Sequence, residues 1–387
     1  MLQIRKAAMI KLGIIGIGNI GLAHAKTIYS GQVEGLSLRA VCDIDPVKKA
    51  IFPDLPFYTD YQQLLKADID AVIISVPHPL HGDFAIAAFE AGKHVLVEKP
   101  ADITVSKARK MNDAAGDRVF GIMFNQRTGN LFQKARDIVK SGLLGQLKRT
   151  DWIITNWYRT QAYYDSGSWR ATWAGEGGGV LMNQAPHQLD LWQWICGMPE
   201  AVYAFCEIGK YHDIQVEDSV RILARFPGGA TGSFTTSTGE FPGTNRLEIV
   251  GTLGKIVIEE GKLKWWRLQE DERAFCKTCR DGSGKIPFTY EELEHEAIRG
   301  HQLILQSFAD AIEKGTPLLA PGKEGIRALS IQNAAYLSSW TDSWVELPFD
   351  EQEYDRLLSL RQTEQVKHTS GTAEAHTDYS PRWQINW

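Results

Sequence analysis

The sequence predicts an α/β protein of two domains, the first built on a parallel β-sheet and the second on a largely antiparallel one. Strand and helix patterns alternate through the first 125 residues, which is typical of βαβ units on a parallel sheet. From Val202 to Leu268 the pattern changes to short strands joined by turn sequences such as Pro227-Gly228-Gly229. The length of 387 residues exceeds one ordinary core and suits two domains of about 100–200 residues each.

The strands of the first domain are expected where short apolar runs end in glycine or proline. Parallel strands that are covered on both faces read as apolar throughout rather than alternating. We expect such strands at Ile10–Ile15, Leu38–Cys42, Ala71–Val76, His94–Val97 and Val119–Phe124, with helices at Leu22–Ser30, Phe84–Ala91 and Thr104–Ala115.

The second domain combines helices with a run of short strands. We expect helices at Leu131–Ser141, Gln188–Cys196, His301–Lys314 and Lys323–Trp340, and strands at Ser219–Phe226, Thr231–Thr238, Leu247–Val250, Lys255–Glu259 and Lys262–Arg267. The residues from 367 onward are polar and without periodicity, which is typical of a loosely held tail. The expected divisions are therefore 1–127, 128–366 and a tail at 367–387.

Composition excludes several classes of partner. The formal net charge is −5 and the pI is about 6.1, whereas binding to a phosphate backbone needs a basic face, so no nucleic-acid partner is expected. No window approaches the roughly 20 apolar residues needed to cross a bilayer, so no membrane partner is expected either. The odd number of five cysteines fits a reducing compartment, here the cytoplasm.

Two of the cysteines, Cys276 and Cys279, are three residues apart. This spacing suits half a zinc site or a redox couple, but the chain offers no second pair and no matching histidines. We expect a surface loop carrying two thiols and no metal site.

Gly16, Gly18 and Gly21 form a G-x-G-x-x-G pattern directly after the first predicted strand and at the start of a helix. This context is the one in which the pattern indicates a dinucleotide site. The first glycine permits the tight turn, the second lets the backbone approach a pyrophosphate, and the third lets helix and strand pack closely. The N–H groups at the helix start, around Asn19 and Ile20, then face the anion.

Asp43 ends the second predicted strand, 22 residues after Gly21. A carboxylate at this place accepts hydrogen bonds from both ribose hydroxyls and repels a 2′-phosphate. Ile44 offers no compensating cation, so the sequence favours NAD over NADP.

Glu98-Lys99-Pro100 stands at the end of a predicted parallel strand. Ligands of open parallel sheets bind outside the carboxyl ends of the strands. Near a cationic nicotinamide the ammonium form of Lys99 is disfavoured, so this lysine is suited to assist the deprotonation of a hydroxyl. The alternative is a solvated surface lysine.

Together these motifs resemble the glucose–fructose oxidoreductase/inositol dehydrogenase/MocA family. The resemblance rests on the G-x-G-x-x-G start, on Ser75-Val76-Pro77 with His81, on Glu98-Lys99-Pro100, and on Gly177–Asp190. It covers the chain to about residue 350. It implies an N-terminal Rossmann domain and a C-terminal domain whose open-faced sheet packs against a second subunit, giving a homodimer or homotetramer.

The family's activity implies an NAD-dependent oxidoreductase that moves a hydride between the nicotinamide and a ring hydroxyl carbon of a sugar, glycoside or cyclitol. Lys99 matches the family's active-site lysine and His187 its catalytic histidine. The family commonly carries an aspartate where this chain has Asn183, which removes a charge that would stabilise an imidazolium. Arg127 and Arg170 match basic residues near the pocket, and for Arg170 the alternative role is an ordinary pair with a carboxylate.

The resulting candidate residues fall into two groups. Those for the cofactor are Gly16, Gly18, Asn19, Ile20, Asp43, Ser75, Pro77, His81, Glu98, Lys99 and Arg170, and those for the substrate are Lys99, Arg127, Tyr163, Trp169, Asn183 and His187, with Lys99 and His187 as catalytic residues.

Two other functions remain open at this stage. An NAD-dependent glycosidase would oxidise its sugar only transiently, but such relatives usually depart from Glu-Lys-Pro. A non-catalytic NAD- or sugar-sensing regulator typically loses the lysine or the histidine, and this chain keeps both.

Overall fold

The computed structural model describes residues 9–167 and 169–364. Within these ranges the chain divides into two compact units. The first runs up to Asn125 and includes Arg299–Ile326, and the second holds Gln126–Ile298 and the chain from Arg327 onward. The tail predicted from residue 367 lies outside the described residues.

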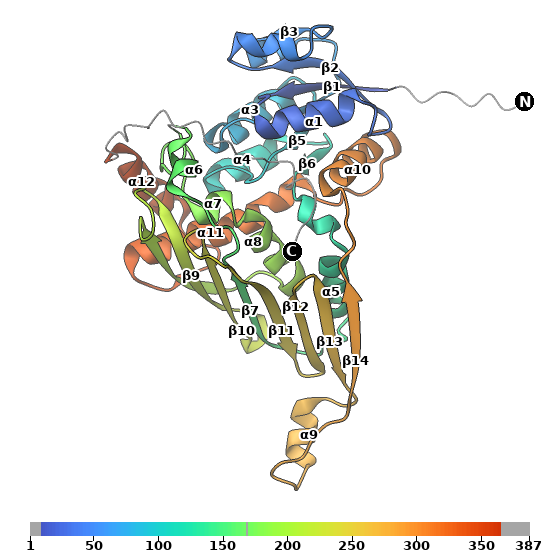
Figure 1. Cartoon of the computed structure of the whole chain (residues 1–387), viewed down its shortest axis with the longest axis vertical. Helices are drawn as coiled ribbons and strands as arrows, with labels where there is room; N and C mark the ends of the chain where they lie inside the picture. The colour runs from blue at the N-terminus through green and yellow to red at the C-terminus, as the bar shows by residue number, and fades with distance from the viewer. Residues whose placement is uncertain (1–8, 168, 365–387) are drawn as a thin grey trace, which may run out of the picture. The chain divides into compact units, whose positions relative to one another are not determined.

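The first unit contains a six-stranded parallel sheet in the order β3-β2-β1-β4-β5-β6 (Figure 1). β1 pairs with β2 on one side and with β4 on the other, so the strand order reverses at β1. This is the crevice at which doubly wound sheets bind their ligands. The elements of this unit are β1 (Ile10–Ile15), α1 (Asn19–Tyr29), β2 (Leu36–Cys42), β3 (Phe57–Tyr58), α2 (Tyr61–Leu65), β4 (Ala71–Ile74), α3 (His81–Glu90), β5 (His94–Val97), α4 (Val105–Ala114), β6 (Phe120–Ile122) and α10 (Gly300–Lys314), with short 3₁₀ turns at Pro46–Ile51, His78–Leu80 and Gly322–Glu324.

The expected division at residue 127 needs a correction, because α10 and the residues after it return to the first unit. Ile304, Leu305 and Phe308 of α10 are buried. The amide of Ile122 at β6 donates to the carbonyl of Ala320. The helix pattern alone predicts α10 correctly, but it does not indicate which of the two sheets buries its apolar face.

The second unit contains a nine-stranded mixed sheet in the order β14-β13-β12-β11-β7-β10-β9-β8-β15. Its pairs are antiparallel except for β7 with β10, which run parallel. Its elements, with a 3₁₀ turn at each of Asn125–Thr128 and Pro227–Gly229, are α5 (Asn130–Lys140), β7 (Leu147–Ile154), α6 (Gln161–Asp165), α7 (Val180–Asn183), α8 (Pro186–Cys196), β8 (Ala201–Ile208), β9 (Glu217–Arg225), β10 (Thr231–Ser237), β11 (Asn245–Gly251), β12 (Gly254–Glu259), β13 (Lys262–Leu268), α9 (Glu272–Thr278), β14 (Phe288–Glu294), α11 (Gly325–Thr341), β15 (Val345–Glu346) and α12 (Glu351–Thr363).

β7 lies in the middle of this sheet, although the sequence analysis expected no strand there. Its buried residues alternate, since Thr150, Trp152 and Ile154 face the core while Ile153 is exposed. Trp192 of α8 donates through Nε1 to the Thr150 hydroxyl at 3.0 Å, which fixes the helix on this face of the sheet. Trp192 and Phe234 of β10 pack with ring centroids 5.7 Å apart. Trp152 and Trp192 therefore belong to the core of the second unit.

Cys276 lies on α9, between β13 and β14, and is exposed, whereas Cys279 follows that helix and is half-buried. No group of three or more potential metal-ligating side chains occurs in the part of the chain that the structure describes. Among the helices of that part, none combines the length and the apolar character needed to cross a membrane.

Candidate active site

Two of the three glycines in the turn between β1 and α1 are required by close backbone contacts, and the third faces open space. Gly16 has φ of +87°, and a Cβ there would lie 2.5 Å from the carbonyl oxygen of Ser75. A Cβ at Gly21 would lie 1.9 Å from the carbonyl oxygen of Gly16, so the helix can approach only without a side chain. A Cβ at Gly18, in contrast, would meet no atom within 4 Å. The open space at Gly18, beside the start of α1, fits the pyrophosphate of a dinucleotide.

Asp43 lies at the end of β2 and reaches back to this turn. Its Oδ2 accepts from the amide of Ile17 at 2.9 Å and from Lys48 Nζ at 2.8 Å. The side chain is 8% exposed. The carboxylate is thus held beside the glycine turn, where the ribose of a bound NAD would need it. Lys48 is a cation that the sequence analysis did not place here.

His81 connects the loops that follow β4 and β5. Its Nδ1 lies 2.7 Å from the carbonyl oxygen of Pro100, and its Nε2 lies 2.9 Å from that of Val76. The ring is fully buried, and burial lowers the pKa of His81 against the opposing effect of these two carbonyls. The geometry supports an indirect role in which His81 holds Pro77 and Lys99 in place. A direct contact of His81 with the cofactor stays a prediction.

Glu98 is buried at the end of β5, where His24 of α1 lies 2.7 Å from its Oε1. Burial alone would raise the pKa of Glu98, but the hydrogen bond and charge of His24, with the charges of His301 and Lys99, hold it at about 2. Its Oε2 accepts from the amide of Lys99 at 3.1 Å. Glu98 therefore fixes the backbone from which the half-buried Lys99 side chain extends. Sequence reasoning missed His24, although its place among the inward-facing residues of α1 was a usable signal.

In the second unit, three predicted residues belong to one polar network. Arg170 Nη1 donates to the Tyr163 hydroxyl at 2.9 Å, and Asn183 Nδ2 lies 3.3 Å from the same oxygen. Asn183 Nδ2 also donates to Glu176 Oε1 at 2.5 Å. The Arg170 guanidinium lies over the ring of Trp169, 4.6 Å from its centroid. The structure thus brings Tyr163, Trp169, Arg170 and Asn183 together, and adds Glu176.

His187 occupies the first turn of α8 and is half-buried. The preceding segment, which contains Gly179 and α7, is held by Glu217 at the start of β9. The Glu217 carboxylate accepts from the amides of Gly179 and Leu181 and from the Tyr336 hydroxyl, at 2.7–3.0 Å. A Cβ at Gly179 would lie 1.9 Å from the carbonyl oxygen of Glu217. Glu217 therefore sets the path of the chain that leads into the histidine helix.

The buried Glu217 carboxylate makes the stability of the second unit depend on pH. Burial raises the pKa of Glu217 from 4.5 to about 7, against the lowering effect of its hydrogen bonds to Tyr336, Leu181 and Gly179. The folded state therefore binds the proton more tightly than the unfolded chain. The protonated Glu217 therefore adds about 3 kcal/mol to the free energy of unfolding. This contribution is fully present below pH 4.5 and is lost as the pH rises through 7. We expect urea unfolding to show this loss in wild-type protein and not in Glu217→Gln.

The comparison is made between the two proteins at each pH from 4.5 to 8. Burial also raises the pKa of Asp102 in the first unit to about 7, so Asp102 changes the stability of the protein over the same pH range. The difference between wild type and Glu217→Gln isolates Glu217, and parallel pH profiles would contradict the assignment.

Arg127 forms a buried ion pair. Its Nε and Nη2 donate to the two carboxylate oxygens of Asp190, both at 2.7 Å, and each side chain is 1% exposed. Such a two-point pair leaves the guanidinium surrounded by protein. The geometry therefore supports a structural ion pair for Arg127 rather than the predicted contact with substrate.

Two family models match the chain. Residues 10–120 match the oxidoreductase family with an NAD-binding Rossmann fold, and residues 132–257 match the GFO/IDH/MocA C-terminal domain. NAD is therefore the cofactor, in agreement with the open glycine turn and the position of Asp43.

Individual relatives agree with the family models. Levoglucosan dehydrogenase of Pseudarthrobacter phenanthrenivorans is 27% identical over 88% of this chain and 98% of its own length. The WlbA dehydrogenase of Chromobacterium violaceum, solved with NADH and UDP-GlcNAcA, is 27% identical with a TM-score of 0.77, over 89% of this chain and 98% of that one. An α-N-acetylgalactosaminidase of Shewanella oneidensis is 30% identical, but only over 46% of this chain and 42% of its own length. The chain belongs to the glucose–fructose oxidoreductase/inositol dehydrogenase/MocA family of NAD-binding oxidoreductases.

Proposed function

We propose that the protein is an NAD-dependent dehydrogenase that oxidises a ring hydroxyl of a sugar, glycoside or cyclitol. The observation that carries the proposal is Lys99, which extends from the end of β5 in the cofactor-binding unit. Its backbone is fixed by the buried, ionised Glu98 at 3.1 Å. A lysine at this edge of a dinucleotide-binding sheet is suited to proton transfer at the alcohol.

Each part of the chain has a defined task in this proposal. The glycine turn with Asn19 and Ile20 binds the pyrophosphate, and Asp43 binds the adenosine ribose. NAD supplies the acceptor for the two electrons of the alcohol carbon. Lys99 and His187 hold the reacting hydroxyl and remove its proton, while Ser75 and Pro77 line the nicotinamide side.

Lys99 and His187 are suited to share this proton because they differ in chemistry. Histidine exchanges a proton near neutral pH. Asn183, which ends α7 four residues before His187, provides hydrogen bonds but no negative charge. Lys99 therefore carries the larger part of the proton transfer in this chain.

A glycosidase that uses tightly bound NAD is the second candidate, favoured by the partial match to the galactosaminidase. The two functions differ in net redox change. A dehydrogenase produces one NADH for each alcohol oxidised, whereas a glycosidase releases an aglycone and leaves the NADH concentration unchanged. A sensing regulator would do neither, and would only bind its ligands.

The test is a panel of inositols, aldoses, anhydrosugars and glycosides, assayed with added NAD and separately with NADP. We expect NADH to accumulate with at least one polyol and with NAD in preference to NADP. Release of an aglycone without NADH would favour the glycosidase. Binding without either product would favour the regulator.

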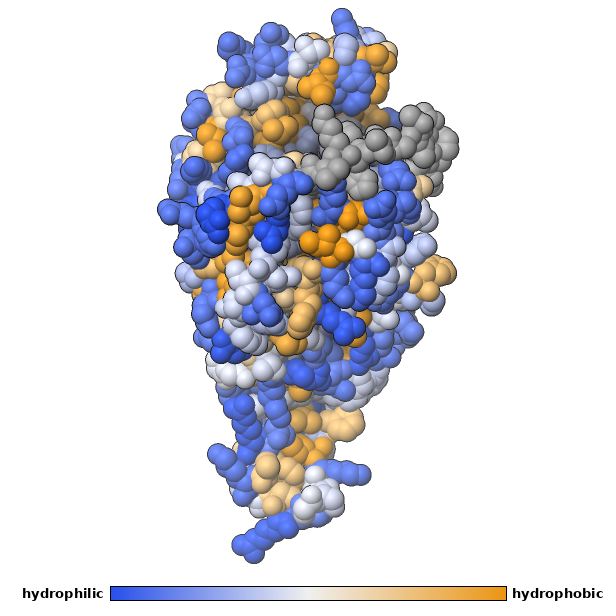
Figure 2. Space-filling model, turned by 90° about the vertical axis from the view of Figure 1, so that its left-hand side faces the viewer, coloured by the Kyte–Doolittle hydropathy of each residue, from blue (hydrophilic) through white to orange (hydrophobic). Residues whose placement is uncertain are grey.

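We also propose that a second copy of the chain covers the open face of the nine-stranded sheet. Ile153, Phe205 and Leu223 lie on strands β7, β8 and β9 and are 40%, 53% and 47% exposed. Figure 2 shows one side of the molecule, where hydrophobic residues are interspersed among hydrophilic ones. Burial of these apolar side chains against a second copy would stabilise such an association. Sedimentation of the wild type and of Phe205→Glu would test whether the assembly depends on this face.

A further inference from the structure

We propose that Tyr163 and Arg170 form a subsite for a carboxylate of the substrate, so that the preferred sugar or cyclitol carries an acidic group. This inference rests on the proposed function, because it names the substrate class of the same enzyme. It is carried by the hydrogen-bond donors of the two residues, which all lie within the second unit.

The Tyr163 hydroxyl has more donors around it than its oxygen can accept. Arg170 Nη1 lies at 2.9 Å, and the side-chain amides of Asn183 and Gln184 lie at 3.3 Å each. A hydroxyl oxygen has two acceptor sites and one proton to donate. Among the residues that the structure describes, none accepts the Tyr163 proton. The phenolic O–H is therefore left to donate to a ligand.

The Arg170 guanidinium also retains unused donors. Its single side-chain hydrogen bond within residues 9–167 and 169–364 goes to Tyr163 through Nη1. The side chain is 14% exposed, so it reaches the surface of the unit without being freely solvated. It lies over the rings of Tyr163 and Trp169, with its central carbon 4.7 and 4.6 Å from the two centroids. These ring contacts fix the plane of the guanidinium, which suits the two-point recognition of a carboxylate.

Glu176 forms a long ion pair with Arg170 and accepts its hydrogen bonds from other groups. It is 2% exposed, its Oε2 accepts from the amide of Ala171 at 2.6 Å, and its Oε1 accepts from Asn183 at 2.5 Å. The nearest Arg170 nitrogen is 3.9 Å away. A buried carboxylate facing the Asn183 amide requires that Nδ2, rather than Oδ1, points toward Tyr163. Glu176 is thus a positioning residue that makes Asn183 a donor to the tyrosine.

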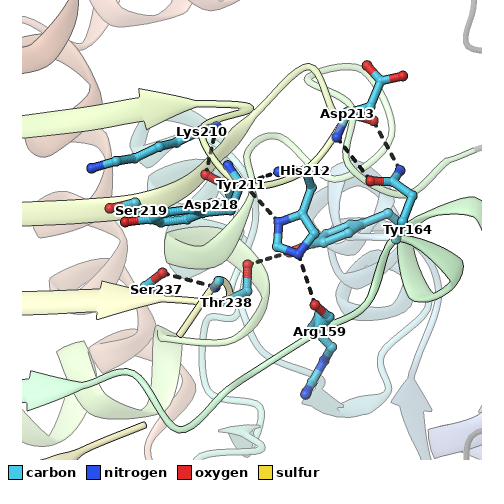
Figure 3. A network of polar contacts seen from close by, with 12 residues as sticks. Arg159, Tyr164, Lys210, Tyr211, His212, Asp213, Asp218, Ser219, Ser237 and Thr238 are labelled. Carbon is cyan, nitrogen blue, oxygen red and sulfur yellow. Dashed lines mark hydrogen bonds and ion pairs between the residues drawn. The ribbon is translucent and has the colours of Figure 1, made fainter. Parts of the chain in front are cut away.

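The segment that carries Tyr163 is itself anchored by the network in Figure 3. Asp218 accepts from the amides of Tyr211 and His212 and from His212 Nδ1, all at 2.8–2.9 Å. His212 Nε2 lies 2.9 Å from the carbonyl oxygen of Arg159. The Tyr164 and Thr238 hydroxyls are hydrogen-bonded at 2.7 Å. Contacts of this number on both sides of the segment fix the tyrosine position before any ligand arrives.

The choice of a carboxylate follows from the donor set. One neutral O–H and one guanidinium converge, and neither contributes an acceptor. A neutral sugar hydroxyl would have to leave its own proton without a partner at such a site, whereas a carboxylate has acceptor sites only. Charge-assisted hydrogen bonds are also about twice as strong as neutral ones.

The test compares hexuronates with their neutral methyl esters, which keep the same ring hydroxyls and lack the charge. Binding to the NADH-loaded protein is measured by calorimetry, and oxidation by NADH formation. We expect wild type to prefer the acid by about ten- to hundred-fold. Arg170→Gln and Tyr163→Phe should each remove most of this preference and leave the dissociation constant of NADH within about three-fold, because the glycine turn and Asp43 belong to the first unit and the two changed residues to the second.

Tyr164→Phe is the matched control, because it removes a neighbouring buried hydroxyl whose partner is Thr238. It should leave the ratio of acid to ester unchanged. Equal binding of acid and ester by wild type, or no binding of any hexuronate, would overturn the proposal. So would weakened NADH binding in Arg170→Gln with an unchanged ratio, since Arg170 would then serve the phosphates of the cofactor. A failure of the dehydrogenase assignment is seen separately, as an absence of NADH formation with every polyol while the binding ratio persists.

Discussion

Replacing Lys99 with methionine is expected to lower turnover about 1,000-fold and to leave the dissociation constant of NADH within about three-fold. Removal of a positioned acid–base group typically costs 10²- to 10⁴-fold in rate, whereas pyrophosphate binding depends on the glycine turn. Methionine keeps most of the length and the apolar stem of lysine, so the loss reports on the amine. The measurement is steady-state oxidation of the best substrate from the panel, together with fluorescence titration of NADH.

Lys110→Met provides the matched control for this experiment. Lys110 lies on α4 in the same unit and its side chain is exposed. Its replacement should leave both turnover and NADH affinity near wild type. Turnover of Lys99→Met within ten-fold of wild type would mean that another group removes the proton, and the role of Lys99 would have to be abandoned.

The second large effect is expected at Asp43, where a change to asparagine should lower the preference for NAD over NADP by about 100-fold. The wild-type carboxylate is 8% exposed and repels a 2′-phosphate, while it also occupies Lys48 Nζ at 2.8 Å. Asparagine keeps an acceptor for the amide of Ile17 but removes the charge. The ribose of NAD loses a charge-assisted hydrogen-bond partner, and Lys48 becomes available to the 2′-phosphate of NADP. Each of these two effects lowers the preference for NAD over NADP by about ten-fold.

The double variant Asp43→Asn with Lys48→Met separates the two contributions. It should bind NAD as weakly as Asp43→Asn does. It should also lose the increase in NADP affinity that Lys48 provides in that variant. Ratios of kcat/KM for the two cofactors are the readout. A ratio for Asp43→Asn within three-fold of wild type would remove the ribose role from Asp43.

The cofactor half of the site was largely predictable, because its determinants are local in sequence. The glycine turn follows the first strand, and Asp43 ends the second, so the pattern specifies both the residue types and their place. The predicted strands Ile10–Ile15 and His94–Val97 agree with β1 and β5 to the residue. Lys48 follows Asp43 by only five residues, but it reaches the carboxylate through the 3₁₀ turn Pro46–Ile51, which the strand pattern does not indicate.

The partners of the substrate-side residues were much less predictable. Arg127 matched a pocket residue by resemblance, and its pairing with Asp190, 63 positions later, became visible only in the structure. Glu176 stands in a glycine-rich run that gave no reason to connect it with Asn183. β7 was missed because three apolar residues follow one another in its sequence, although Trp152 and Ile154 are buried and Ile153 between them is exposed.

The sequence by itself determined most strands and helices of the first unit, apart from β3 and α2, together with the dinucleotide turn and the acidic residue that favours NAD. These features depend on backbone sterics and on the spacing of apolar residues within a few turns, which are properties of short segments. Only the tertiary structure decided that α10 returns to the first sheet, that His24 fixes Glu98, and that Glu176 orients Asn183 toward Tyr163. Each of these contacts joins groups that hydrophobic packing brings together, and polar groups buried by that packing must pair with whichever partner it supplies.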